Sequence, residues 1–144
     1  MALKIYDADQ VAISIAGIPI TGGYADGEFC RIERETDAFV DVVGTDGEVT
    51  RSKSGDDRAT VTILLMQTAE SNALLAALHN ADKLAANGAG VGPLLIKDLN
   101  SDTTLHSSPE CWVQSSPSVS YGREAGAREW PIRVSKLIDF VGGN

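Results

Sequence analysis

One stretch, residues 59–98, constrains the fold of this chain more than any other. Its first nine residues alternate, with Val61, Ile63 and Leu65 on one side, which is the periodicity of a β-strand. A helix is predicted next, over about residues 69–86, because apolar residues recur there at helical spacing. A glycine-rich turn and a second strand follow. No other segment has a convincing helical pattern, so this one helix must cover much of one sheet.

The predicted helix has a start signal and one apolar stripe. Thr68 is a suitable N-cap, because its hydroxyl can accept a hydrogen bond from a first-turn amide. The same helical phase places His79 near the exposed side. The stripe is expected to pack on a sheet, and it consists of Leu74, Leu75, Leu78, Ala81 and Ala85.

The remainder of the chain is predicted to be mainly strands within one domain, residues 1–144. Pro19 and the glycines after it are expected to end the first strand, since proline cannot donate to a ladder. Residues 137–141 are expected to extend the last long strand past a bulge. The predicted strands outside the opening stretch are 11–16, 28–34, 37–43, 103–106, 110–114, 118–121 and 128–135.

Charge and hydropathy exclude some classes of protein. The formal net charge is −8 and the pI is near 4.6, which argues against a nucleic-acid binder that needs a basic face. The longest purely apolar run, residues 63–66, is far too short to span a membrane, and the charged start predicts no signal peptide. Two cysteines without a CxxC motif favour free thiols in a reducing cytoplasm.

The usual signals of catalysis are absent. The glycine-rich segment 88–92 follows a helix and precedes a strand, whereas a phosphate loop needs the reverse order. His79 and His106 have no second ligand at zinc-binding spacing. Cys30 lies in an alternating strand, which favours a packed thiol over a nucleophile. The sequence therefore predicts no catalytic residue, no cofactor and no metal site.

A polar segment of mixed charge, residues 45–58, interrupts the strong strands. Asp46-Gly47 is a favourable hairpin turn. The segment is either a solvated loop or a hairpin arm that reaches a neighbouring subunit. The second alternative suits a chain of many strands, because open sheet edges must be closed, covered or paired with another copy. The candidate interface residues are Thr45, Asp46, Glu48, Arg51, Lys53, Asp56, Asp57 and Arg58.

Several segments resemble the inner tail tube proteins of contractile-tailed phages. The resemblance runs over nearly the whole chain and is extended rather than confined to one diagnostic motif. It implies a mainly β fold of two packed antiparallel sheets, sandwich-like or barrel-like, flanked by one α-helix. The segments that carry it are YADGEF (24–29), DVVGTDGEVTRS (41–52), ATVTILLMQT (59–68), GAGVGPL (88–94) and AREW (127–130).

The resemblance also implies a structural role without enzymatic activity. Six copies would form a ring around a lumen, stacked rings would form the tube, and DNA would pass through it at ejection without specific binding. Arms would bridge subunits and rings. The implied partners are further copies of the chain, the tail sheath, the baseplate and the tail terminator, with no membrane involved. The implied location is the virion tail, after assembly in the cytoplasm of the host bacterium.

An acidic lumen would let DNA slide, since an anion gains nothing from counterion release there. Glu33, Glu35 and Asp41 are the candidate lumen residues, and the alternative is that they face solvent or the sheath. Two other functions stay open. One is the tube of a contractile bacteriocin or a type VI-like secretion machine, and the other is a monomeric β-barrel that binds a small ligand. A sizing column or an electron micrograph would distinguish a monomeric ligand-binding protein from a tube-forming one.

Overall fold

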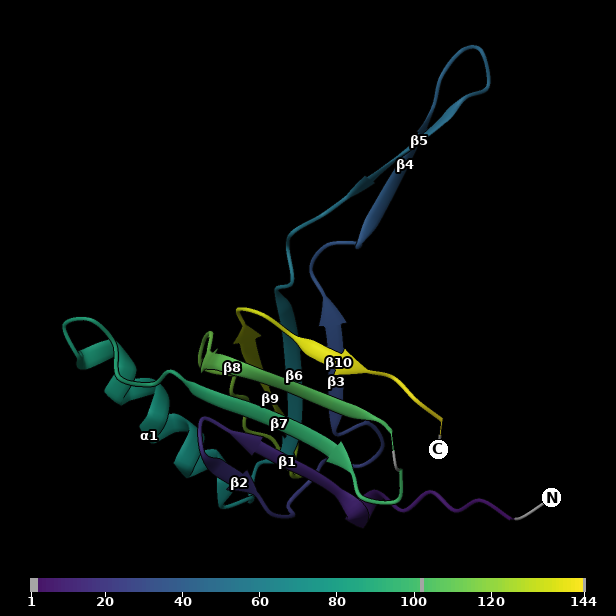
Figure 1. Ribbon diagram of the computed structural model, residues 1–144. Helices are drawn as coiled ribbons and strands as arrows, with labels where there is room; N and C mark the ends of the chain where they lie inside the picture. Colours follow the sequence, from purple (N-terminus) through teal and green to yellow (C-terminus); the bar gives the residue numbers. More distant parts are fainter. Residues whose placement is uncertain (1–2, 102, 144) are drawn as a thin grey trace.

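The computed structural model describes residues 3–101 and 103–143, which form ten strands, one α-helix and one short 3₁₀-helix (Figure 1). The strands make two antiparallel sheets, so the prediction of a mainly β chain with two sheets and one helix is confirmed. The elements in chain order are η1 (Ala8–Gln10), β1 (Val11–Ile15), β2 (Ile18–Ile20), β3 (Cys30–Arg34), β4 (Phe39–Val43), β5 (Val49–Lys53), β6 (Ala59–Met66), α1 (Ser71–Leu84), β7 (Gly92–Asp98), β8 (Leu105–Val113), β9 (Ala127–Val134) and β10 (Ile138–Phe140).

The larger sheet folds over into two layers. Its strand order is β2-β1-β7-β8-β9-β6-β3, with β10 also paired to β8, and the second sheet contains β4 and β5 alone. In Figure 1, β1, β7 and β8 run across β3, β6 and β9. The two layers join where Cys111–Val113 of β8 pairs with the end of β9. The apolar core lies between the layers, because side chains from β1, β6, β7 and β9 belong to one buried cluster.

Strand β6 is the centre of this core. Val61, Ile63 and Leu65 are fully buried, as the alternation of the sequence predicts. On the neighbouring strand β9, Trp130 and Ile132 are buried on the same side, which the sequence also predicts. The opposite side of both strands is only partly covered, so this layer keeps one face toward the outside.

Helix α1 is shorter than predicted, and the predicted N-cap is wrong. Glu70 occupies the N-cap position, with no capping hydrogen bond from its side chain, and Thr68 lies before it in a turn. The predicted buried stripe is also wrong at Leu74, which is 48% exposed, whereas Leu75 is fully buried. His79 is buried and not near the exposed side, so the sheet-facing side of the helix is rotated from the predicted one.

A buried polar contact accounts for this rotation. The Trp130 indole Nε1 donates to Asn72 Oδ1 at 2.9 Å, and Asn72 Nδ2 donates to the Met66 carbonyl at 2.8 Å. These two bonds fix the first turn of α1 against β9 and the end of β6. A buried amide held on both sides is favourable, whereas the same amide without partners would be costly. The helix therefore turns Asn72 inward and Leu74 outward.

Replacing Asn72 with alanine is expected to lower the free energy of unfolding by about 1–3 kcal/mol, because the Trp130 N–H would stay buried without an acceptor. Urea unfolding monitored by tryptophan fluorescence measures this change. Asn80→Ala is the matched control, since Asn80 lies on the exposed side of the same helix. Equal stabilities of the two variants would contradict the anchoring role of Asn72.

Two predictions about strands that contain proline are wrong for identifiable reasons. Pro19 does not end the first sheet segment but lies in β2, an edge strand, after a tight turn in which Ala16 and Gly17 have φ of 51° and 84°. Predicted strands 103–106 and 110–114 are one strand, β8, which continues through Pro109. Pro109 is tolerated because it lies between the part of β8 that pairs with β10 and the part that pairs with β9.

The C-terminal part of the chain also differs from its prediction. Residues 118–121 form no strand. Residues 138–140 do not extend β9, because β10 turns back and pairs with the beginning of β8. Leu137 is buried at this reversal, so the apolar residues after β9 belong to a strand that turns back and not to an extension of β9 past a bulge.

Candidate assembly surfaces

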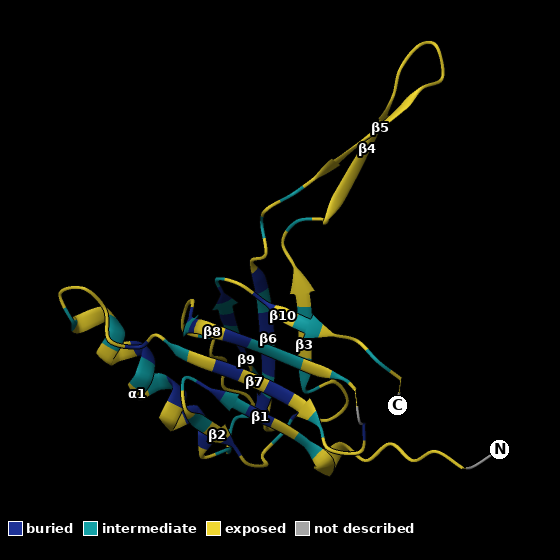
Figure 2. Cartoon of the chain, viewed as in Figure 1, coloured by how far each residue is buried: buried dark blue, intermediate teal, exposed yellow. Residues whose placement is uncertain are grey.

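A two-stranded hairpin projects from the body of the protein (Figure 1). It consists of β4 and β5, paired from Phe39↔Lys53 to Val43↔Val49, and we call residues 39–53 the arm. All ten strand residues are exposed, as Figure 2 shows. The polar segment therefore contains one strand of a hairpin, and the other strand is the one that the sequence assigned to the body. Contact of this hairpin with a neighbouring subunit stays a prediction.

The tip of the arm is a tight turn at the predicted place. The Gly44 amide donates to the Glu48 carbonyl at 2.8 Å, and the Glu48 amide donates to Asp46 Oδ1 at 3.1 Å. Gly47 has a φ of 89°, a conformation that glycine adopts without strain. The turn thus closes the hairpin with the arm's own hydrogen bonds.

The two faces of the arm differ in chemistry. Cross-strand partners share a face, so the register divides the ten strand residues without ambiguity. One face mixes charge with apolar bulk, and on it the Arg51 guanidinium lies 4.2 Å from the centre of the Phe39 ring. The other face is small and uncharged. The first face contains Phe39, Asp41, Val43, Val49, Arg51 and Lys53, and the second contains Val40, Val42, Thr50 and Ser52.

The valines of the arm are highly exposed, because no other layer of the protein covers them. Val42, Val43 and Val49 are 65%, 61% and 63% exposed. A two-stranded ribbon cannot bury its own side chains, and an exposed apolar ribbon of this kind marks an interaction surface. The arm is thus a candidate contact surface for another chain.

The candidate interface residues fall into three groups. Thr45, Asp46 and Glu48 form the tip, and Arg51 and Lys53 lie on β5. The last three residues of the set lie outside the hairpin, in the segment that joins it to β6. That segment, residues 54–58, together with residues 35–38 on the other side, is the root of the arm, and it contains Asp56, Asp57 and Arg58.

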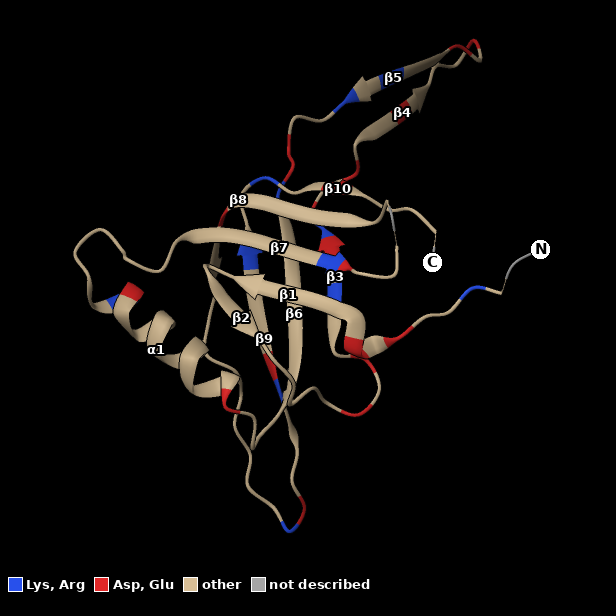
Figure 3. Cartoon of the chain, turned by 60° about the horizontal axis from the view of Figure 1, so that its bottom comes forward, with Lys and Arg blue, Asp and Glu red and all other residues tan. Residues whose placement is uncertain are grey.

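A second candidate surface is the outward face of the layer β3-β6-β9. It has charges of both signs, as Figure 3 shows on β3 and β9. Glu33 lies on this face, 3.8 Å from Arg31. Glu35 forms an ion pair with Arg133 and accepts a hydrogen bond from Thr60, and these contacts lower the pKa of the Glu35 carboxyl, with the Thr60 bond contributing most. The face is therefore polar, and most of its charges are paired.

The structure separates the three candidate lumen acids. Glu33 and Glu35 lie on or next to the outward face of β3, whereas Asp41 lies on the arm opposite Arg51. The three therefore do not form one acidic row on a single sheet. Glu129 on β9 shares the outward face. The alternation of its strand already predicts that it points outward, but only the pairing of β9 with β6 places it on the same face as Glu33.

Both sides of this layer end in unpaired strand edges. The Leu64 amide donates to the Phe29 carbonyl, so by antiparallel alternation the amides of Cys30 and Ile32 point away from β6. The Gln67 amide donates to the Gly126 carbonyl, so the amide of Glu129 likewise points outward from β9. Within residues 3–101 and 103–143, no strand pairs with the outer edge of β3 or with the first half of β9.

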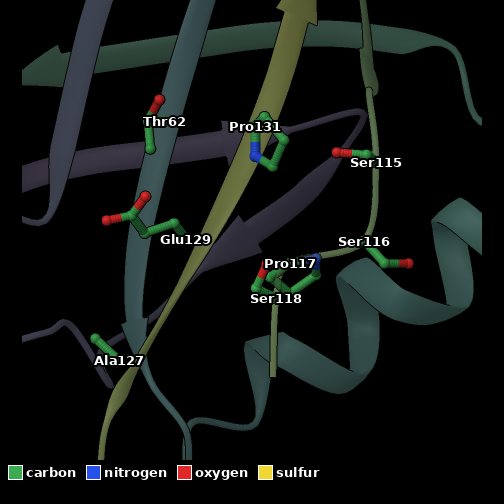
Figure 4. A pocket seen from close by; sticks show the side chains of 8 residues that line it. All are labelled: Thr62, Ser115, Ser116, Pro117, Ser118, Ala127, Glu129 and Pro131. Atoms are coloured by element: carbon green, nitrogen blue, oxygen red, sulfur yellow. The ribbon is translucent and has the colours of Figure 1, made fainter. Parts of the chain in front are cut away.

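An open hollow lies beside the unpaired half of β9. Its volume is about 440 Å³, and Figure 4 shows it between Glu129 and Pro131 on one side and the segment 115–118 on the other. Its lining consists of serine, threonine, proline, one alanine and one carboxylate. This set lacks a nucleophile paired with a base, so the hollow offers room at a strand edge and not a reaction centre.

The cysteine and histidine that the sequence offered for catalysis or metal binding lie in environments that do not suit either role. Burial, with a smaller effect from Glu28, raises the pKa of the Cys30 thiol to about 12, so it stays protonated. Burial also lowers the pKa of His106, against the opposing attraction of Asp139. Across the described residues, no three His, Cys, Asp or Glu side chains are placed to hold a metal ion. No helix in the same residues has the length and apolarity to span a membrane.

The glycine-rich segment after α1 is a connector held by the helix. The amides of Ala89 and Gly90 both donate to Asp82 Oδ1, at 2.9 and 3.1 Å. Gly88 has a φ of 81°, which allows the chain to reverse after the helix. Because a carboxylate of the same chain already accepts these two amides, the segment does not present them to a phosphate.

Comparisons with known proteins agree with this architecture. Residues 6–142 match the family described as Bacteriophage PhiTE tail tube protein. The structural protein ORF10 of Pseudomonas phage KPP10 is 33% identical over an alignment of 144 positions, which covers 96% of this chain and 83% of that protein.

Solved structures with low sequence identity share the fold. The tube-terminating cap of the anti-feeding prophage has a TM-score of 0.60 at 8% identity, and the match covers 99% of this chain and 95% of that one. The sheath/tube terminator of the extracellular contractile injection system PVC has a TM-score of 0.61 at 11% identity, with coverage of 98% and 100%. A chain of the PVC sheath-tube complex has a TM-score of 0.57 at 12% identity, with coverage of 96% and 93%.

The family match spans nearly all of the chain, and the phage relative is similar over the same length. The chain therefore belongs to the family of bacteriophage PhiTE tail tube proteins, which are structural proteins and not enzymes.

Proposed function

We propose that six copies of this chain form a ring, and that stacked rings form the inner tube of a contractile phage tail through which DNA is ejected. The observation that carries the proposal is the layer β3-β6-β9, which has a polar outward face and unpaired edges along β3 and along the first half of β9. Pairing the β3 edge of one copy with the β9 edge of the next would continue the sheet from subunit to subunit. Such a head-to-tail contact closes into a ring when its rotation allows.

In this arrangement the polar outward face of the layer would line the lumen. Glu33, Glu35 and Glu129 would contribute negative charge, partly balanced by Arg31 and Arg133. A lumen without excess basic charge gives DNA no counterion-release gain, so DNA would move along it without being held. The arm would contact a neighbouring subunit or ring, with the sheath, baseplate and terminator as further partners in the virion tail.

Two alternatives make different predictions. A bacteriocin or secretion tube would share the fold, and the relationship to a phage structural protein favours the phage tail. A monomeric ligand-binding barrel needs an interior cavity, whereas core side chains of both layers pack together in the described structure.

Electron microscopy of the purified protein tests the proposal directly. We expect rings or tubes with a central hole, with sixfold symmetry in end-on views. A protein that stays monomeric on a sizing column at high concentration, with no rings on the grid, would refute the proposed function.

Replacing Glu129 with proline is expected to prevent ring closure while the subunit stays folded. The variant removes an outward-pointing amide and leaves the β6–β9 ladder intact. Glu129→Gln is the control, because it removes only the charge. Analytical ultracentrifugation and circular dichroism measure assembly and folding. Rings of the proline variant that are as stable as those of the control would show that this edge is not used.

A further inference from the structure

The root of the arm contains one carboxylate that accepts hydrogen bonds from both of its segments. Asp56 Oδ2 accepts a hydrogen bond from Thr36 Oγ1 at 2.6 Å, and Thr36 lies on the segment that enters the arm. Arg58, on the segment that leaves it, donates to the same carboxylate from Nε at 2.9 Å and from Nη2 at 3.0 Å. The Arg58 amide donates to Asp56 Oδ1 at 3.1 Å. Each carboxylate oxygen therefore has two donors within the chain.

The environment of this carboxylate favours its charged form strongly. The hydrogen bonds from Arg58, and after them the bond from Thr36, hold the pKa of Asp56 well below its usual range. Two-pronged bonds between a guanidinium and a carboxylate are also more specific in geometry than single ion pairs. The root is thus held by directional bonds at neutral pH, with the Asp56 side chain at their centre.

A second set of contacts ties the root to the body. Arg34 at the end of β3 donates to Asp139 Oδ1 at 2.6 Å and to the Leu137 carbonyl at 3.1 Å, and it lies 3.7 Å from Asp57. The Leu137 amide donates to the Asp57 carbonyl at 2.9 Å. The leaving segment is therefore held at Asp57 against the end of β3 and the residue that precedes β10.

The arm itself does not pack against the body. Its strand residues are all exposed, so packing against the body does not set its direction. The Ser54 amide donates to the Ala38 carbonyl at 2.8 Å, which starts the ribbon directly above the Asp56 contacts. The direction of the arm must therefore be set at the root.

We propose that Asp56 is a positioning residue that fixes the direction in which the arm leaves the body, so that the free subunit presents the arm to its neighbour in one orientation. This inference rests on the proposed role of the arm in subunit contact. A preoriented arm loses less conformational freedom when it docks, and this speeds productive association. The Thr36 bond is the side-chain link between the entering and the leaving segments. It adds to two backbone bonds between them, from the Glu35 amide to the Arg58 carbonyl at 3.2 Å and from the Ser54 amide to the Ala38 carbonyl.

The test compares Asp56→Asn with Glu70→Gln, which makes the same change of charge at an exposed side chain at the start of α1, away from the arm. ¹⁵N relaxation of dilute, unassembled protein measures arm motion relative to the body, and light scattering measures the rate of tube formation. We expect larger arm motion in Asp56→Asn and tube formation that is slower by roughly three- to tenfold, with the control unchanged. Thr36→Val removes the side-chain bond between the two segments, leaves the backbone bonds from Glu35 to Arg58 and from Ser54 to Ala38 in place, and should change both readouts in the same direction.

The outcomes separate positioning from other roles. Larger arm motion with an unchanged rate of tube formation would overturn positioning, because direction would then not limit assembly. Slower assembly with an unchanged arm would also overturn it, since Asp56 would then act as a contact residue. An unchanged arm and an unchanged rate would show that the root needs no carboxylate. If a protein without the arm still forms tubes, the proposed role of the arm fails, whereas the effect of Asp56 on arm motion can still be observed.

Discussion

Replacing residues 39–53 with a short glycine–serine link is expected to give a folded subunit that forms no tubes. Every residue of this segment is exposed, so the core loses no side chain. Ala38 and Ser54 are already joined by a backbone hydrogen bond, so a short link can close the gap between them. The free energy of unfolding should therefore change by no more than about 0.5 kcal/mol.

Assembly should respond very differently from stability. The variant loses the exposed valines and Phe39, which form the apolar part of the proposed contact. Removal of a central apolar anchor typically dominates the energy of an interface, so we expect tube formation to fall by roughly 100-fold or more. Electron microscopy and sedimentation measure it, with Thr45→Ser as a control that keeps the arm. Normal long tubes from the shortened protein would exclude the arm from subunit contact. The link must spare Asp56, so that loss of the arm is not confused with loss of its root.

Leu75→Asp is expected to prevent folding, and Leu74→Asp is expected to be tolerated. Leu75 is fully buried in the core cluster, whereas Leu74 is 48% exposed. A carboxylate at position 75 would be buried without a partner. The milder Leu75→Ala should lower the free energy of unfolding by about 2–5 kcal/mol, the usual cost of truncating a core leucine. Circular dichroism and urea unfolding compare the variants. The reverse order of stabilities would mean that the helix presents its other side to the sheet.

The strands of the core could be predicted because their information is local. Alternation along β6 and β9 marks the buried side of each strand within a few residues. The orientation of α1 could not be predicted in the same way. The adjacent residues Leu74 and Leu75 are compatible with more than one buried face of the helix. The hydrogen bond that decides between these faces comes from Trp130 on strand β9, far away in the sequence.

The arm shows the same division between local and distant information. Asp46-Gly47 marks the turn, and a strand was predicted before it, whereas the polar sequence of β5 did not distinguish a strand from a loop. The run from Phe39 to Val43 nevertheless has the composition of a core strand, and no local feature reveals that no layer covers it. Glu35 was missed as a paired acid because Arg133 and Thr60 approach it only through the sheet.

The register of the arm has a consequence for each newly made subunit. The ribbon that an assembly would bury is open to any other chain before assembly, and the apolar run of β4 contains neither proline nor glycine. Such runs add edge to edge unless a charge interrupts them. Asp41 is the single charge within β4, and Arg51 is its cross-strand neighbour. These two side chains therefore act as gatekeepers against premature aggregation, at the very surface that association would use.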